Sequence, residues 1–206
     1  MYKRQQPSKE ALDLILEYEV GGGKAYYDKY LQHPTWPGGA SGTTLAIGVD
    51  CGYYTPEELG KIFHFLPTNQ LNVIKNASGK TGLAGRDYVN QIKPYNITVT
   101  WDQAIEIFNT LTWPKFANLA EKAFPGLDQL CDNAYGALVS LVFNRGTSMS
   151  GSSRSEMRNI RNLVPQKDYK GIAEELRSMK RIWEGKGLDG LIARREAEAQ
   201  LVETCA

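Results

Sequence analysis

The run from Tyr135 to Phe143 limits the folds open to this chain more than any other feature. It is apolar on nearly every face of a helix, and such a helix has to lie inside the protein with other elements around it. Asp128 or a neighbouring residue is expected to open the helix, and Gly146 to end it. The sequence therefore predicts one central buried helix.

Further start and stop signals for helices lie on both sides of this run. Ser8 can cap a helix over residues 8–20, and the glycines 21–23 must end that helix. Later helices are expected to begin at two capping boxes, Thr55–Glu58 and Thr100–Gln103. Pro114 is expected to break the second of these helices. Two amphipathic helices are expected over residues 168–180 and 191–203.

Residues 24–54 have a different character, because they are rich in Tyr, Thr, Gly and Pro and lack a helical period. They include a β-like run at Thr43–Val49 and a turn at Trp36–Gly39, so we expect a small, irregular hairpin or three-strand lobe. The predicted class is α+β, in one domain over residues 1–206. A β-lobe of about 20–55 is expected beside a larger, mainly helical lobe made of 1–19 and 56–206.

Composition excludes several classes of protein. A chain of 206 residues, 42% hydrophobic and 23% charged, can bury a core without a staple and is not disordered, collagenous or a coiled coil. A formal charge of +1 gives no overall field for nucleic acid or an anionic membrane. Cys51, Cys131 and Cys205 have no metal-binding spacing, so we expect free thiols and no metal or cofactor. No signal peptide and no membrane span are predicted.

Glu19 is the carboxylate in the least expected place. On a helical wheel it lies between Leu12 and Ile15, near the middle of the apolar side of the first helix. A charge there is costly unless it is paired or used. The negative end of the helix dipole and desolvation both favour the protonated form that a general acid needs. The alternative is a frayed last turn that lets Glu19 swing into water.

Glycoside hydrolysis requires, besides an acid such as Glu19, a second carboxylate, and a hydroxyl can help to hold the water. Two aspartates and a threonine are candidates for these two groups. Asp28 follows Glu19 by nine residues, and Asp50 follows Thr44 by six. A second carboxylate that guides water has to lie roughly 6.5–9.5 Å from the acid. Taken singly, each aspartate is also a common turn residue that bonds its own backbone.

The order of these features resembles the tailed-phage lysozyme family over nearly the whole chain. The resemblance is carried by the helix ending in Glu19, by Thr-x-x-Ile-Gly at 44–48, by Ala-Leu-Val-Ser-Leu-Val-Phe-Asn-Arg-Gly at 137–146, and by Arg-Arg-Glu-Ala-Glu-Ala at 194–199. Segments 36–42 and 47–53 look closest to the bacterial branch that includes the lysozyme-like domain of pesticin. The resemblance implies a lysozyme-like fold with a cleft between its lobes. It also implies a muramidase that hydrolyses the β-1,4 bond between N-acetylmuramic acid and N-acetylglucosamine in peptidoglycan.

The resemblance also implies roles for single residues. Glu19 matches the catalytic acid, and Thr44 matches the hairpin threonine that helps to place the attacking water. Asp50 has the Thr-to-Asp spacing of the pesticin-like branch and is favoured as the second carboxylate. Asp28 has the Glu-to-Asp spacing of the phage enzymes and is the alternative.

Four further residues are expected to bind substrate: Asn144, Tyr53, Tyr27 and Arg194. Asn144 matches a cleft-lining amide, although it can instead cap a helix. Arg194 matches an arginine that pairs with the catalytic glutamate, a pair that would oppose the effect of desolvation, although it can instead pair on the surface with Glu196 or Glu198. The tyrosines can stack on sugars or pack the β-lobe.

Two other functions remain open at this stage. A lytic transglycosylase needs the glutamate but no water-placing aspartate, and a glycan-binding module keeps the cleft without turnover. For the lytic enzyme we expect a monomer made in the cytoplasm and delivered by a holin or a secretion system. It would act as an endolysin, an antibacterial effector or a toxin domain, in the effector case with an immunity protein as partner. Neither nucleic acid nor membrane insertion is expected.

The near-neutral charge leads to a prediction about cell-wall binding. A chain of this charge is not drawn to an anionic wall from a distance, because the field of its charges is weak. Binding to purified sacculi should therefore depend only weakly on ionic strength. A pelleting assay over a series of salt concentrations measures this, and a steep loss of bound protein as salt rises would contradict it.

Overall fold

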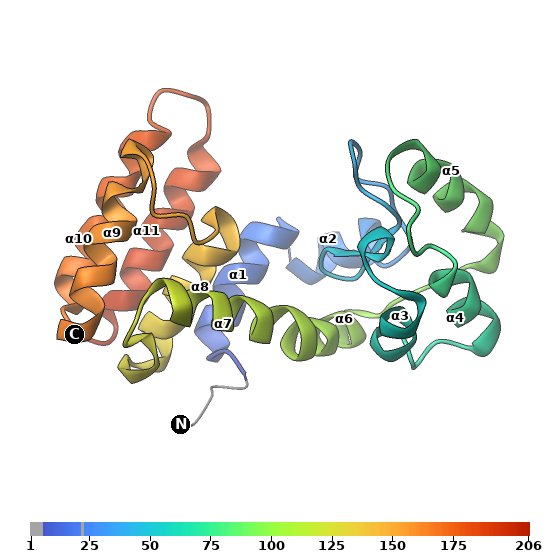
Figure 1. The fold of residues 1–206 in the computed structure, drawn as a ribbon, viewed down its shortest axis with the longest axis horizontal. Coiled ribbons are helices and arrows are strands. Elements are labelled where there is room, and N and C mark those ends of the chain that lie inside the picture. The colour runs from blue at the N-terminus through green and yellow to red at the C-terminus, as the bar shows by residue number, and fades with distance from the viewer. Residues whose placement is uncertain (1–5, 22) are drawn as a thin grey trace. The chain divides into compact units, whose positions relative to one another are not determined.

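The computed structural model describes residues 6–21 and 23–206, which form two compact units (Figure 1). One unit combines the residues up to Glu19 with Thr112–Ala206, and the other is Val20–Leu111. The first contains α1 (Lys9–Val20), whose last residue is at the boundary, with α7 (Trp113–Ala123), α8 (Asp132–Arg145), α9 (Ser155–Leu163), α10 (Tyr169–Ser178) and α11 (Asp189–Glu203). The second contains α2 (Gly23–Tyr30), β1 (Thr44–Leu45), β2 (Val49–Asp50), α3 (Pro56–Ile62), α4 (Thr68–Lys75), α5 (Gly82–Ile92) and α6 (Trp101–Ile107).

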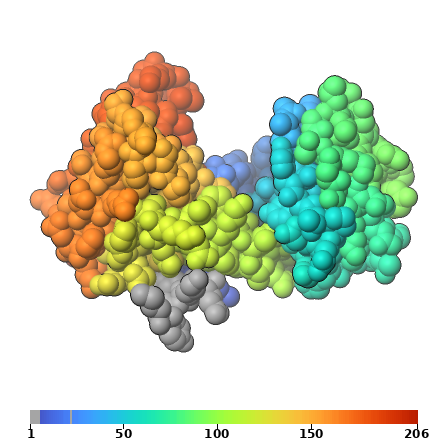
Figure 2. Space-filling view, viewed as in Figure 1, coloured from blue at the N-terminus to red at the C-terminus, as the bar shows by residue number. Residues whose placement is uncertain are grey.

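The prediction of a central buried helix is confirmed by α8, in which residues 134–142 are all buried. Helices α7 and α11 pack on it, and α10 packs on both α9 and α11. Helices α9 and α10, orange in Figure 2, form one continuous face of this unit. The helix ends at Gly146 as expected, but its cap is Cys131. Asp128 instead lies in a separate 3-10 turn, Leu127–Gln129, because Leu127 and Leu130 are both buried there.

Helix α1 crosses α8 at a glycine. A Cβ built on Gly136 would lie 2.1 Å from the Cβ of Ala11, so only glycine permits this close approach. Ser8 fixes the start of α1, since its Oγ accepts a hydrogen bond from the Ala11 amide at 3.2 Å and donates one to Oδ1 of Asn133 at 2.9 Å. The predicted Ser8 cap is confirmed. This crossing anchors the helix that carries Glu19.

The second unit holds the predicted hairpin, but in a shorter form. The run Thr43–Val49 is not one strand: β1 and β2 pair antiparallel around a turn in which Ala46 and Gly48 have positive φ. The turn expected at Trp36–Gly39 lies two residues later, over residues 38–41, where the Ser41 amide donates a hydrogen bond to the carbonyl of Gly38 at 3.1 Å.

Helix α2 was not expected from the sequence. It forms because Tyr27 is fully buried, with its ring at 5.3 Å from that of Trp101 and its hydroxyl donating to the Val99 carbonyl at 2.9 Å. These are packing contacts with a distant segment, and a local period does not reveal them. Since α3–α6 belong to the same unit as the hairpin, this unit extends to Leu111, well beyond the expected limit near residue 55.

Other local signals hold. Both capping boxes are present, at Thr55 with Glu58 and at Thr100 with Gln103. The expected break at Pro114 is confirmed, because a π-helical turn, Phe108–Thr112, separates α6 from α7. Helix α9 is an addition that the sequence did not single out. In the described part of the chain, no helix combines the length and apolarity that crossing a bilayer requires.

The expectation of three free thiols was wrong for two of them. Cys131 and Cys205, which are 74 positions apart in sequence, form a disulfide with their Cα atoms 6.2 Å apart. The fold brings the end of α11 beside the start of α8, where Asn133 Nδ2 also donates to Thr204 Oγ1 at 2.9 Å. Cys51 is free and buried, and burial raises the pKa of its thiol to about 12.

The α1–α8 crossing generates a stability prediction. Gly136→Ala should lower the free energy of unfolding by about 2 kcal/mol or more, because the new methyl overlaps Ala11 and forces the helices apart. Urea denaturation measures the change. Gly190→Ala is the matched control, since a Cβ there meets nothing within 4 Å. Equal stability of the two variants would show that the helices do not cross at Gly136.

Candidate functional site

Glu19 is held at the end of α1 by an arginine from the other end of the sequence. The Glu19 side chain is 28% exposed, and its Oε1 accepts a hydrogen bond from Nη1 of Arg194 at 2.5 Å. Arg194 is only 2% exposed. The pair implied by the resemblance is present, and Glu19 is part of the helix rather than frayed into water. Glu196 pairs elsewhere, with Arg177 and Lys180.

Arg194 is fixed on its other side by two buried residues. Its Nε and Nη2 reach Ser140 Oγ at 3.3 and 3.0 Å, and its Nη2 also donates to the Ser140 carbonyl at 3.2 Å. Glu198 is fully buried, and its Oε1 accepts from Ser140 Oγ at 2.7 Å and Arg194 Nε at 3.3 Å. Arg195, also fully buried, donates from Nη2 to the same oxygen at 2.7 Å. Two guanidiniums and two carboxylates thus form one connected network.

Burial makes the charged groups of this network costly, because they lose their hydration. Desolvation lowers the pKa of Arg195, although the charge of Glu198 opposes the effect. Nε of Arg195 and Oε2 of Glu198 are buried without a hydrogen-bond partner. A buried ion pair stabilises a protein only when its remaining polar atoms are satisfied. The network is therefore not optimised for stability alone, which is typical of a functional cluster.

The hairpin in the second unit places Thr44 directly opposite Asp50. The amide of Cys51 donates to the carbonyl of Thr43 at 2.8 Å, which makes the next pair along, Thr44 with Asp50, a non-hydrogen-bonded pair. Side chains of such a pair lie on the same face, with their Cβ atoms roughly 4.5–5.5 Å apart. A hydroxyl and a carboxylate are thereby brought together.

Backbone amides hold the Asp50 carboxylate in place. The Gly42 amide lies 3.0 Å from both carboxylate oxygens, and the Gly52 amide donates to Oδ1 at 3.1 Å. Both glycines are required by close packing, since a Cβ on Gly42 would lie 2.5 Å from the Lys80 carbonyl oxygen and one on Gly52 would lie 2.7 Å from Cγ2 of Thr81. The second unit thus carries a rigid Thr44–Asp50 pair.

Asp28 has a different environment. It lies on α2, its side chain is 44% exposed, and it forms an ion pair with Lys24 one helical turn away. Such exposed pairs contribute little energy and leave the side chain free to move. Of the two aspartates, only Asp50 is both fixed by the backbone and adjacent to Thr44.

The expected substrate-binding residues divide into two groups. Tyr53 is 66% exposed, with its hydroxyl donating to the Ala40 carbonyl at 2.9 Å, and Asn144 is exposed near the end of α8. Tyr27 and Arg194 are buried, so neither can contact a substrate directly. The structure corrects both of these expectations: Tyr27 packs the second unit, and Arg194 acts on Glu19.

Ser140 and the buried position of Glu198 were missed by sequence reasoning. One signal was available, because Ser140 is a small polar residue inside the apolar run of the central helix. A polar side chain there needs a buried partner. Nothing local identifies that partner as the arginine and glutamate of α11.

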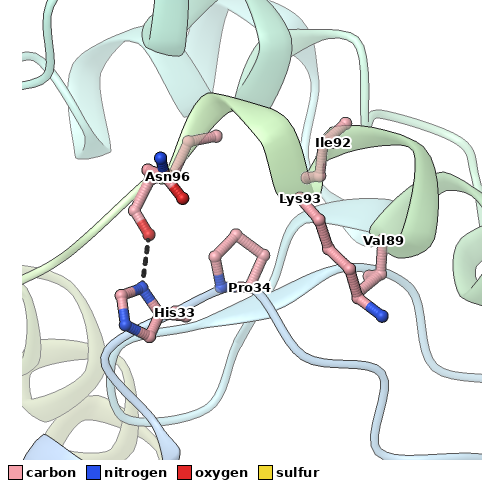
Figure 3. A pocket seen from close by; sticks show the side chains of 7 residues that line it. His33, Pro34, Val89, Ile92, Lys93 and Asn96 are labelled. Atoms are coloured by element: carbon pink, nitrogen blue, oxygen red, sulfur yellow. Dashed lines mark hydrogen bonds between the residues drawn. The ribbon is translucent and has the colours of Figure 1, made fainter.

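The second unit also contains a cavity of about 310 Å³ (Figure 3). His33 lies at one side of it, where its Nδ1 donates to the Ile97 carbonyl at 2.9 Å. The other lining residues are Pro34, Val89, Ile92, Lys93, Asn96 and Ile97. The cavity shares no residue with the Thr44–Asp50 pair. No group of three or more His, Cys, Asp or Glu side chains suited to a metal occurs among residues 6–21 and 23–206.

Comparison with known proteins identifies the class of this chain. The sequence profile of the phage lysozyme family matches residues 69–198, more than half of the chain. The chain therefore belongs to the phage lysozyme family, and the predicted family resemblance is confirmed. Membership supports a lysozyme-like enzyme with a lytic action on peptidoglycan. The pesticin-like branch stays a prediction.

Among solved structures, the chain is similar to the crystal structure of the active form of the P1 phage endolysin Lyz. The identity is 20%, the TM-score is 0.49, and the match covers 96% of this chain and 85% of that chain. No curated protein sequence gives a significant match. The matched profile segment includes Ser140, Arg194 and Glu198 but not Glu19, Thr44 or Asp50.

The backbone clamp on Asp50 generates a prediction. Asp50→Asn should lower the free energy of unfolding by about 1 kcal/mol, because an amide NH₂ replaces a carboxylate oxygen that faces backbone donors. The matched control is Asp28→Asn, whose exposed ion pair should cost less than about 0.5 kcal/mol. Urea denaturation compares the two variants. A larger loss for Asp28→Asn would contradict the assignment of Asp50 as the clamped carboxylate.

Proposed function

We propose that this chain is a muramidase that hydrolyses the β-1,4 bond between N-acetylmuramic acid and N-acetylglucosamine in peptidoglycan. The observation that carries the proposal is the Glu19–Arg194 pair, in a chain that belongs to the phage lysozyme family. Arg194 binds Oε1 of Glu19 and so fixes the carboxyl group in one orientation. Oε2 then carries the proton that passes to the leaving glycosidic oxygen.

In the proposed reaction, Asp50 is the second carboxylate and Thr44 helps to hold the attacking water. Glu19 protonates the leaving oxygen as the glycosidic bond breaks, water attacks the anomeric carbon, and Asp50 takes a proton from that water. Each carboxylate oxygen has two lone pairs, so Asp50 can bind water while it accepts hydrogen bonds from Gly42 and Gly52. Support for this assignment comes from the fixed position of Asp50 opposite Thr44.

Tyr53 and Asn144 are the proposed substrate contacts. Tyr53 is highly exposed and its hydroxyl is tied to the Ala40 carbonyl, so its ring is a pre-ordered platform for a sugar face. Asn144 offers both a donor and an acceptor for an N-acetyl group or a hydroxyl. For biological role we propose lysis as an endolysin or as a delivered antibacterial effector or toxin domain.

A lytic transglycosylase is the second candidate, and one observation favours it. The Asp50 carboxylate is bound by two backbone amides and caps the 3-10 turn Cys51–Tyr53. A structural duty of this kind is sufficient reason for an aspartate to be present. A transglycosylase needs only Glu19 and yields 1,6-anhydro ends, whereas a muramidase yields reducing ends.

Product analysis on purified peptidoglycan tests the proposal. The wild-type chain should release fragments with reducing muramic acid ends. Glu19→Gln should lose about 100-fold or more of the rate, because it cannot donate the proton, and Asp50→Asn about 10-fold or more. Asp28→Asn is the matched control and should keep full activity.

Each alternative has its own outcome in the same assay. Anhydro ends with an active Asp50→Asn variant would establish the transglycosylase. Unaltered pelleting with sacculi and no release by the wild-type chain would establish a binding module. All rates are to be measured well below the unfolding midpoint of each variant, since Asp50→Asn is expected to be less stable.

A further inference from the structure

The strongest unused feature of the first unit is that Arg194 lies between two carboxylates. Glu19, on one side, is partly exposed, and Glu198, on the other, is fully buried. Of these two carboxylates, only Glu19 takes part in the proposed reaction. Burial of the Glu198 carboxylate costs desolvation free energy, and its Oε2 has no hydrogen-bond partner, so its place beside the catalytic pair needs an explanation.

We propose that Glu198 is a positioning residue that acts as the permanent counter-ion of Arg194, so that Glu19 can exchange its proton while the guanidinium stays paired. This inference rests on the proposed function of Glu19 as the acid. Glu198 contacts neither the substrate nor the reacting atoms. Its effect reaches Glu19 only through Arg194.

The contacts of Glu198 support this role. Its Oε1 accepts hydrogen bonds from Arg194, Arg195 and Ser140. Ser140 bridges the two partners, since its Oγ accepts from Arg194 and donates to Glu198. Arg194 is therefore held by groups that do not take part in the reaction. Its position does not depend on whether Glu19 is ionised.

The charges of the network lead to the same conclusion. With Glu19 ionised, Arg194 and Arg195 are balanced by Glu19 and Glu198. When Glu19 carries its proton, Glu198 is the one remaining carboxylate of this network. Without Glu198, protonation of Glu19 would leave two buried guanidiniums unpaired, which is strongly unfavourable. Glu198 thereby makes the proton-bearing form of the acid accessible.

Other groups near the pair come from α1, α8 and α11. Helix α1 supplies Tyr18, whose ring centroid is 5.7 Å from the Arg194 guanidinium, and Glu17, whose charge acts on Tyr18. Burial and the charge of Glu198 raise the pKa of Tyr18, which therefore stays neutral near pH 7. Helix α8 supplies the uncharged Ser140 and, at its end, Arg145, whose positive charge interacts with that of Arg195. The remaining charges are those of Arg195 and Glu198 on α11.

The test is the pH dependence of turnover in Glu198→Gln, measured on soluble peptidoglycan fragments. Loss of the neighbouring negative charge favours ionised Glu19, so the general acid loses its proton at lower pH. The alkaline limb of the rate profile should move down by about 1 pH unit. The rate constant kcat near neutral pH should fall while KM changes little. Ser140→Ala should produce a smaller shift of the same sign.

Glu156→Gln is the matched control. Glu156 is also buried in the first unit and is paired with an arginine, Arg181 at 2.5 Å, but it is not part of the Glu19 network. This variant should lose stability without a shift of the alkaline limb. If Glu198→Gln behaves like Glu156→Gln, with lower stability and an unchanged profile, the inference is overturned.

The remaining outcomes are also decisive. If Glu198→Gln does not fold, Ser140→Ala carries the test, and an unchanged alkaline limb in that variant overturns the inference. If wild type and Glu19→Gln have equal activity, the proposed function fails instead. Loss of activity in Glu19→Gln with an unshifted limb in both network variants rejects the role of Glu198 and leaves the function intact.

Discussion

A guanidinium with almost no exposure to water can stay charged only where carboxylates and carbonyls replace its hydration. Arg194 meets that condition through Glu19, Glu198 and Ser140, which come from α1, α11 and α8. The packing of the helices in the first unit makes this contact possible. Gly136 lets α1 lie against α8, and the packing of α11 on α8 brings the arginine into reach. The position of the carboxyl group of Glu19 is thus a property of three packed helices rather than of one helix end.

In the second unit, backbone amides hold the Asp50 carboxylate in position. Gly42 and Gly52 both donate to the Asp50 carboxylate, and the hairpin register places Thr44 beside it. Because a Cβ on either glycine would overlap its neighbours, the glycines are part of the site and not only of a turn. Glu19 is held by a charged side chain that other groups keep in place, whereas Asp50 is held by neutral donors. This difference fits an acid that gains and loses a proton and a carboxylate that remains ready to accept one.

Sequence reasoning succeeded where the cause was local. The two capping boxes, the break at Pro114 and the apolar run of α8 each depend on residues within one or two turns, and all three are confirmed. It failed where the cause was a distant contact. Helix α2 depends on Tyr27 packing against Trp101, and the disulfide depends on the fold bringing Cys205 to Cys131. Glu19 was found because a carboxylate on an apolar face is a local anomaly. The buried partners of Arg194 were missed: Ser140 gave a local signal as a polar residue in an apolar helix, but nothing local identifies Glu198 as its partner.

The contact between Glu19 and Arg194 is tested most directly by a double-mutant cycle in the free energy of unfolding. Glu19→Ala, Arg194→Met and the double variant would be compared with the wild-type chain by urea denaturation at neutral pH. A partly buried ion pair of this kind should give a favourable coupling energy of about 1 kcal/mol or more. A coupling energy near zero would show that Arg194 does not hold Glu19 in solution, and would contradict the account.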